Sequence, residues 1–281
     1  MSITVVTTFH EEGMQKYGQR FIDSFAERVD SKVKLMVYAE DCTPEAKGPH
    51  IDIYDVNHNL PKLVSFKQRW KDVPKANGKC PEDIKARRPR DWHKEFKWDA
   101  IRFSHKVYAI FDAAQKVDTD WLVWMDADTF VHSDISYHEF VELLPKDKWL
   151  TYVGRGKGSN TWPECGFYGM NLKHNMCQKF LKEFEHYYDD ADNGIFTLEE
   201  WHDSFVFGHI VNELKRIDSN ILDYTANIVN RNAKTGGGGH PYINSILGTW
   251  FDHMKGDRKF VGKSKEKDLV QHRPEKYWNE V

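Results

Sequence analysis

Two aspartates, Asp126 and Asp128, are the residues of this sequence whose chemistry is easiest to name, because their carboxylates stand one residue apart. Such a pair can share a hard divalent cation such as Mg²⁺ or Mn²⁺, directly or through a water, and leaves the other positions of the ion for phosphate oxygens. The spacing alone is a weak signal, since it occurs two more times in the chain. The other pairs are Asp118/Asp120 and Asp190/Asp192.

The position of each pair relative to a strand separates them. Trp121–Met125 is an unbroken apolar run, which is typical of a strand buried on both faces, and Asp126 and Asp128 follow at its carboxyl end. In open α/β sheets the ligand crevice lies outside the carboxyl ends of the strands. The first of the other pairs precedes the strand and the second ends a polar helix. We therefore favour a metal site at Asp126 and Asp128 over a simple turn after a strand.

The elements around this strand predict an α/β fold with a mostly parallel central sheet flanked by helices. The chain opens with an apolar strand, a helix and two further strands, which is the start of a βαβ unit. At 281 residues we expect one large domain spanning 1–281. The first four elements are Ile3–Thr8, Gly13–Arg28, Val33–Ala39 and Ile51–Val56; later helices are expected at 97–114, 133–144, 173–188 and 205–214, and a later strand at 149–153.

Composition indicates a soluble globular protein, with 40% hydrophobic and 30% charged residues. No apolar run approaches the roughly eighteen residues of a membrane span. The N-terminus reads as a strand and not as a signal peptide. The four cysteines show neither metal-site spacing nor a disulfide framework. We expect a cytoplasmic protein, in the host cytoplasm if it is viral.

The D-x-D segment at Asp126 and Asp128 resembles that of nucleotide-sugar glycosyltransferases with the GT-A fold. A second segment, from His253 through Gly256 to Lys259, resembles the H-x-x-G-x-x-K segment of glycogenin-like, retaining members of that group. The resemblance implies Mn²⁺ or Mg²⁺ held by the two aspartates and His253 against the diphosphate of the donor, with Gly256 and Lys259 contacting the phosphates. His272 is the alternative third ligand.

The resemblance also assigns residues that precede and follow the D-x-D segment. It implies contacts of Thr8 and Asp41 with the base and ribose, and of Arg102 and Lys106 with the phosphates. It places Asp203, at the start of a helix, in the sugar site. The expected activity is transfer from a nucleotide sugar, with UDP-sugar the favoured donor, and retention of anomeric configuration. Each residue has a structural alternative: Asp41 and Asp203 can cap a turn or helix, and Arg102 and Lys106 can form a solvated helix face.

A basic segment bears on the acceptor. Residues 62–106 hold 14 Lys and Arg against 6 Asp and Glu, a balance of +8 in a chain of net charge −3. Within it, residues 72–93 predict a basic insertion or loop containing Arg87, Arg88 and Arg90. This charge favours a polyanionic acceptor, and resemblance to enzymes of bacterial viruses suggests a hydroxylated base in DNA. A glycan, a lipid-linked sugar or a protein is the alternative acceptor.

Two other classes of function remain open. A nucleotidyltransferase or phosphohydrolase also pairs carboxylates on a metal behind a parallel sheet, and a non-catalytic nucleic-acid-binding protein could use the basic segment alone. Residues 234–241, which include four consecutive glycines, predict a glycine-rich lid over the site. The sequence leaves the oligomeric state open.

Overall fold

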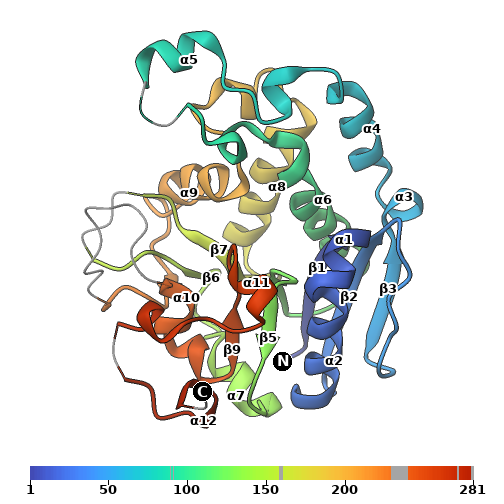
Figure 1. Ribbon diagram of the computed structural model, residues 1–281, viewed down its shortest axis with the longest axis vertical. Coiled ribbons are helices and arrows are strands. Elements are labelled where there is room, and N and C mark those ends of the chain that lie inside the picture. The colour runs from blue at the N-terminus through green and yellow to red at the C-terminus, as the bar shows by residue number, and fades with distance from the viewer. Residues whose placement is uncertain (89, 91, 158–160, 229–239, 271, 280–281) are drawn as a thin grey trace.

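The computed structural model describes residues 1–88, 90, 92–157, 161–228, 240–270 and 272–279. Its centre is a seven-stranded sheet of order β3-β2-β1-β4-β7-β6-β8. Neighbouring strands are parallel except that β7 lies antiparallel to both β4 and β6. The expected α/β class, with a mostly parallel sheet flanked by helices, is confirmed (Figure 1). The strands are β1 Ile3–His10, β2 Val33–Glu40, β3 Ile51–Asp55, β4 Trp121–Met125, β6 Leu150–Val153, β7 Glu164–Asn171 and β8 Ile221–Asp223.

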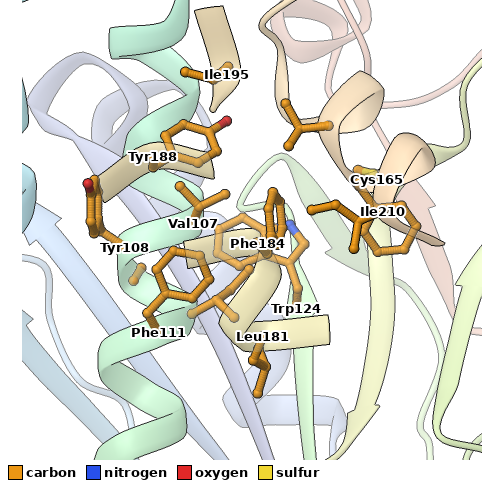
Figure 2. Packing of buried hydrophobic residues seen from close by; sticks show 14 of the residues in the cluster. Val107, Tyr108, Phe111, Trp124, Cys165, Leu181, Phe184, Tyr188, Ile195 and Ile210 are labelled. Atoms are coloured by element: carbon orange, nitrogen blue, oxygen red, sulfur yellow. The ribbon is translucent and has the colours of Figure 1, made fainter. Parts of the chain in front are cut away.

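Helices cover both faces of the sheet. Successive side chains of β4 point to opposite faces, so alternate residues pack against different groups of helices. Leu122 and Trp124 pack with side chains of α4, α6, α8 and α9, part of which Figure 2 shows. Trp121, Val123 and Met125 pack with side chains of α2, α7 and α10 on the other face. All five residues of β4 are buried, which explains its unbroken apolar run. The helices are α2 Gln19–Arg28, α4 Pro61–Trp70, α6 Ala100–Lys116, α7 Tyr137–Glu142, α8 Asn175–Asp189, α9 Asp203–Leu214 and α10 Pro241–Asn244.

A short ribbon beside the main sheet brings the C-terminal part of the chain to the end of β4. Strand β5, Thr129–Val131, pairs antiparallel with β9, Phe251–His253. In this register Thr129 stands opposite His253, so the histidine lies beside the turn that carries Asp126 and Asp128. The ribbon thus joins residues that are more than a hundred positions apart in the sequence (Figure 1).

Several elements differ from the sequence predictions. Residues 164–171, for which no element was predicted, form β7, a fully buried strand. The helix expected from Gly13 begins as a π-helical turn, Met14–Gly18, before α2. The expected loop at 72–93 contains a 3₁₀ turn, Pro74–Ala76, and the helix α5, Glu82–Arg87. The four glycines of the expected lid lie outside the described residues.

No helix in the part of the chain that the structure describes combines the length and apolar character needed to cross a bilayer.

Candidate functional site

Asp126 and Asp128 lie in the turn that connects β4 to β5. The turn is closed by a backbone hydrogen bond in which Thr129 N–H donates to the Asp126 carbonyl at 3.0 Å. Asp126 N–H donates to the Gly166 carbonyl on β7 at 2.9 Å, which anchors the turn to the sheet. The indole Nε1–H of Trp124 donates to Asp126 Oδ1 at 2.8 Å. The position of the pair is therefore set by backbone contacts and by a buried tryptophan.

His253 completes a compact group with the two aspartates. Its Nε2 lies 3.1 Å from Asp128 Oδ1 and 3.4 Å from Asp126 Oδ2. One ligand atom from each of the three residues lies within 4.8 Å of the others, and this is the group of metal-ligand type found among the described residues. Two carboxylates and one imidazole suit a divalent cation of the Mg²⁺ to Mn²⁺ type. The residues therefore fit the metal that the sequence suggested.

Glu164, the first residue of β7, lies behind the histidine and was not predicted as an individual site residue. Its Oε1 is 3.5 Å from His253 Nδ1, on the side of the ring away from the aspartates. Lys255 forms an ion pair with its other oxygen, and Arg155 Nη2 lies 3.7 Å from that oxygen. A carboxylate behind a metal-binding imidazole fixes the orientation of the ring. No sequence pattern marked this glutamate, because its partner is 89 positions away.

Gly166 makes room for the histidine ring. A Cβ atom at this position would lie 2.5 Å from Cε1 and 2.6 Å from Nδ1 of His253, and 3.2 Å from Oε1 of Glu164. Contacts below 3.0 Å require one side to move, and here the obstacle is a buried ring and not the end of a flexible chain. The glycine is therefore needed because an imidazole packs directly on the strand.

The charges of the group are mutually balanced. Burial alone would raise the pKa of both aspartates, but Lys106 at Asp126 and His253 at Asp128 hold each pKa below its usual value. Burial alone would lower the pKa of His253, but Asp128 and Asp126 raise it to about 9. Binding of a cation at these ligands would therefore displace a proton from the imidazole.

Lys106 connects the aspartate pair to Asp203. Its Nζ lies 2.8 Å from Asp126 Oδ1 and 2.5 Å from Asp203 Oδ2, although the angles at Asp203 Oδ2 are not those of a hydrogen bond. It also donates to the Cys165 carbonyl at 2.8 Å. Burial opposes the charge of this lysine, but Asp126 and Asp203 raise its pKa above the ordinary value. The alternative that Lys106 belongs to a solvated helix face is therefore wrong, because its side chain is buried among these groups.

Asp203 is the first residue of α9 and is buried, and the N-cap of the helix is His202, whose ring accepts a hydrogen bond from Phe205 N–H at 3.3 Å. The alternative that Asp203 or Ser204 serves as the cap is therefore wrong. Its carboxylate contacts Lys106, which in turn contacts Asp126.

Lys259 reaches the site from the short helix α11, Arg258–Val261, which a turn at Gly256 connects to β9. Its Nζ lies 2.8 Å from Asp128 Oδ2 and 4.8 Å from the centre of the Tyr17 ring. Gly256 in this turn has φ +57°, a left-handed conformation that a residue with a Cβ adopts only with strain. Nothing lies within 4 Å of a Cβ built there, so the backbone conformation and not crowding requires the glycine.

A pocket of about 620 Å³ opens next to these residues, and we call it the α6 pocket. Thr8 and Arg102 line it, as the resemblance implied, whereas Asp41 does not. Asp41 instead accepts a hydrogen bond from Asn57 Nδ2 at 2.9 Å. His272 is exposed and is absent from the group with the two aspartates. The lining of the α6 pocket includes Thr8, Tyr17, Arg102, His105, Lys106, Asp126, Asp128 and Lys259.

The basic segment is neutralised within the fold to a large extent. Arg87 and Arg88 form ion pairs with Glu199 at 2.9 and 3.6 Å, and Arg88 also pairs with Glu200 at 2.5 Å. Both arginines therefore have carboxylate partners within the fold, and the polyanionic acceptor stays a prediction. Other pairs from this segment are Lys62 with Glu185 and Asp189, Lys67 with Glu40, Arg69 with Asp192 and Lys97 with Glu200.

No protein-family model matches this sequence, and no curated protein matches it. Similar solved structures include the glycosyltransferase GlyE of Streptococcus pneumoniae TIGR4 (11% identity, TM-score 0.42, 79% of this chain and 45% of that chain). WbbM, a bifunctional glycosyltransferase, matches at 13% identity and TM-score 0.43 over 79% of this chain and 38% of that chain. Mouse xyloside xylosyltransferase 1 matches at 11% identity and TM-score 0.43 over 79% of this chain and 84% of that chain. The chain spans less than half the length of the first two.

Proposed function

We propose that this chain is a metal-dependent glycosyltransferase that takes its sugar from a nucleoside-diphosphate sugar, with a UDP-sugar as the favoured donor. The observation that carries the proposal is the group formed by Asp126, Asp128 and His253 at the carboxyl end of β4, beside a pocket of about 620 Å³. Two lysines, Lys106 and Lys259, contact the same aspartates. This combination suits a ligand with a diphosphate between two polar ends.

Each residue has a separate task in this proposal. Asp126, Asp128 and His253 would hold Mn²⁺ or Mg²⁺, which supplies Lewis-acid stabilisation of the departing diphosphate. Lys259 exchanges its carboxylate partner for a phosphate oxygen, and Arg102, exposed at the pocket, adds a second positive charge there. Thr8 and Tyr17 also line the α6 pocket, and Thr8 is assigned to the nucleoside end of the donor.

Asp203 acts on the sugar. Because Lys106 holds its carboxylate, we assign Asp203 to orienting sugar hydroxyls and stabilising positive charge at the reacting carbon, and not to removing the acceptor proton. This role accords with retention of anomeric configuration, which the resemblance of the His253–Lys259 segment suggested. NMR of the anomeric proton of the product decides the point, since an inverted linkage would require Asp203 to be the base.

The test is release of nucleoside diphosphate from a panel of UDP- and GDP-sugars with Mn²⁺ or Mg²⁺. We expect Asp126→Asn/Asp128→Asn to abolish release and to remove Mn²⁺ binding measured by titration calorimetry. The matched control is Asp190→Asn/Asp192→Asn, which changes the same pattern at a distant turn and should leave both readouts unchanged. Equal release by the wild type and the Asp126/Asp128 variant would refute the metal assignment. Nucleoside monophosphate as the first product would identify a nucleotidyltransferase.

A further inference from the structure

A second cleft of about 650 Å³ lies along α9, and nothing in the proposed donor chemistry uses it. We call it the α9 cleft. Its walls come from α9, from the segment that follows β6, and from Arg88 and Glu199 at the edge of the basic segment. Its lining combines aromatic, amide and charged groups, including Tyr152, Arg155, Trp162, Phe205, His209 and Asn212.

The charges of the α9 cleft are balanced. Arg88 is held by Glu199 and Glu200, and Arg155 lies 3.7 Å from Glu164. The lining holds three basic residues and three acidic ones, counting also Lys215 and Asp223. A polyanion such as DNA requires a surplus of positive charge along its path, and the part of the lining that the structure describes has no such surplus. Its electrostatics suit a neutral ligand rich in hydroxyl groups.

Trp162, one of the aromatic residues of the cleft, is held in a fixed position by its neighbours. Lys97 Nζ lies 5.0 Å from the centre of the Trp162 ring, and the His202 ring packs against it with centroids 4.5 Å apart. Arg155 Nε donates to the Trp162 carbonyl at 3.0 Å. Trp162 is half-buried and lines the cleft. A fixed tryptophan presents an apolar surface to the C–H face of a sugar ring, while amides and carboxylates satisfy the hydroxyls.

The cleft is joined to the proposed catalytic group by short contacts. Arg155, in its lining, faces Glu164, and Glu164 faces His253 at 3.5 Å. Glu200, also in its lining, lies 3.1 Å from His202 Nε2, and His202 directly precedes Asp203. One set of buried charged residues therefore connects the lining of the α9 cleft with the proposed catalytic group.

From these observations we propose that the α9 cleft binds the acceptor, and that the acceptor is a neutral glycan. The inference rests on the proposed transferase function, because it assigns the second substrate of that reaction. Trp162 supplies the surface on which a sugar ring stacks. The Asn212 amide can donate to or accept from the sugar hydroxyls, and the Glu199 carboxylate can accept from them.

The test is binding of the full chain to an immobilised panel of neutral glycans, anionic glycans and a DNA oligonucleotide, without donor or added metal. We expect binding to neutral glycans, a loss of at least tenfold in Trp162→Ala and partial recovery in Trp162→Phe. The matched control is Trp92→Ala, since Trp92 is an exposed tryptophan of the basic segment that does not line the cleft. Circular dichroism establishes that each variant is folded.

Binding only to anionic glycans or DNA, no binding to any neutral glycan, or equal binding by wild type and Trp162→Ala would each overturn the proposal. Because the assay needs neither donor nor metal, its failure is distinct from failure of the transferase function. Neutral-glycan binding that depends on Trp162, together with no release of nucleoside diphosphate, would support a carbohydrate site while refuting the transferase.

Discussion

Glu164 shows how much of a site depends on a residue that does not touch the ligand directly. Its carboxylate lies 3.5 Å from Nδ1 of His253, whose opposite nitrogen faces Asp126 and Asp128. Lys255 keeps the carboxylate charged, since burial would raise its pKa but this lysine lowers it to about 2. The arrangement fixes the plane of the imidazole before any cation arrives.

We predict that Glu164→Ala lowers the affinity for Mn²⁺ by about 10- to 100-fold, because the histidine ring loses the group that orients it. Glu164→Gln should have a smaller effect, since a side chain of the same shape stays beside Nδ1. Titration calorimetry measures both. An unchanged affinity in Glu164→Ala would mean that packing alone orients the ring.

The second prediction at this scale concerns Gly166. We expect Gly166→Ala to displace His253, whose ring atoms lie 2.5 and 2.6 Å from the added Cβ, and to weaken Mn²⁺ binding as severely as His253→Ala. The matched control is Gly169→Ala on the same strand, where the added Cβ meets side-chain atoms of Leu144 and Thr151 and not the site. The control should lose stability and keep its metal affinity. Equal metal affinity in both variants would contradict this explanation.

Among the elements, the C-terminal segment holds β9, and therefore His253, in place. His132, which follows β5, stacks on Tyr277 with ring centroids 4.1 Å apart and an interplanar angle of 4°. Its Nε2 lies 3.2 Å from the Gly248 carbonyl, to which neutral imidazole can donate. The Tyr277 hydroxyl donates to the buried Asp252 at 2.8 Å. The end of the chain is thus joined to both strands of the ribbon.

This packing predicts a loss of stability in acid. Burial lowers the pKa of His132 to about 4, while the nearby Glu275 and Arg273 act in opposite directions. Because the folded pKa lies below the unfolded one, the contribution is present above about pH 6.5 and is lost as the pH falls toward 4. Relative to His132→Gln, the wild type should lose about 2 kcal/mol of unfolding free energy between pH 7 and pH 5, measured with urea. Parallel pH profiles of the two proteins would contradict this.

The elements also show where sequence reasoning succeeded and where it failed. Strand β4 was predicted with its observed bounds, because a doubly buried strand has an unmistakable apolar run. Strand β7 was missed, because Gly166 and Gly169 interrupt its apolar pattern. Both positions require glycine because side chains distant in the sequence pack against them, and the local sequence cannot show this packing. Strands β5 and β9 have three residues each and are defined by their pairing. The segment containing His253 was found through its motif, but its register opposite Thr129 required the fold.

For the molecule as a whole, charge complementarity links the basic segment to the rest of the fold. The sequence correctly indicated a charge imbalance, but it could not show that the partners are within the same chain. Glu200 is fully buried and contacts Lys97 at 3.0 Å, Arg88 at 2.5 Å and His202 at 3.1 Å. Its neighbour Glu199 is half exposed and pairs with arginines at the surface.

These adjacent glutamates should differ sharply in their effect on stability. We predict that Glu200→Ala costs about 3–5 kcal/mol, because it leaves the buried Lys97 without its carboxylate. Glu199→Ala should cost about 0–1 kcal/mol, because its ion pairs are exposed to solvent. Chemical denaturation of the two variants at neutral pH measures the difference. Similar costs would mean that the buried pair contributes no more than a surface pair does.

The same charge pairing has a consequence for synthesis. Residues 62–106 leave the ribosome before their partners at 185–200 exist, and the roughly hundred residues between them take about 5–20 s to translate. During that interval the nascent chain exposes a strongly basic segment next to ribosomal RNA, to which such segments adhere. We expect the N-terminal strands to assemble while this segment is still held by RNA, and its release to await the arrival of Glu185, Asp192 and Glu200. The timing of translation, and not only the final balance of charges, then determines when residues 62–106 pack against their acidic partners.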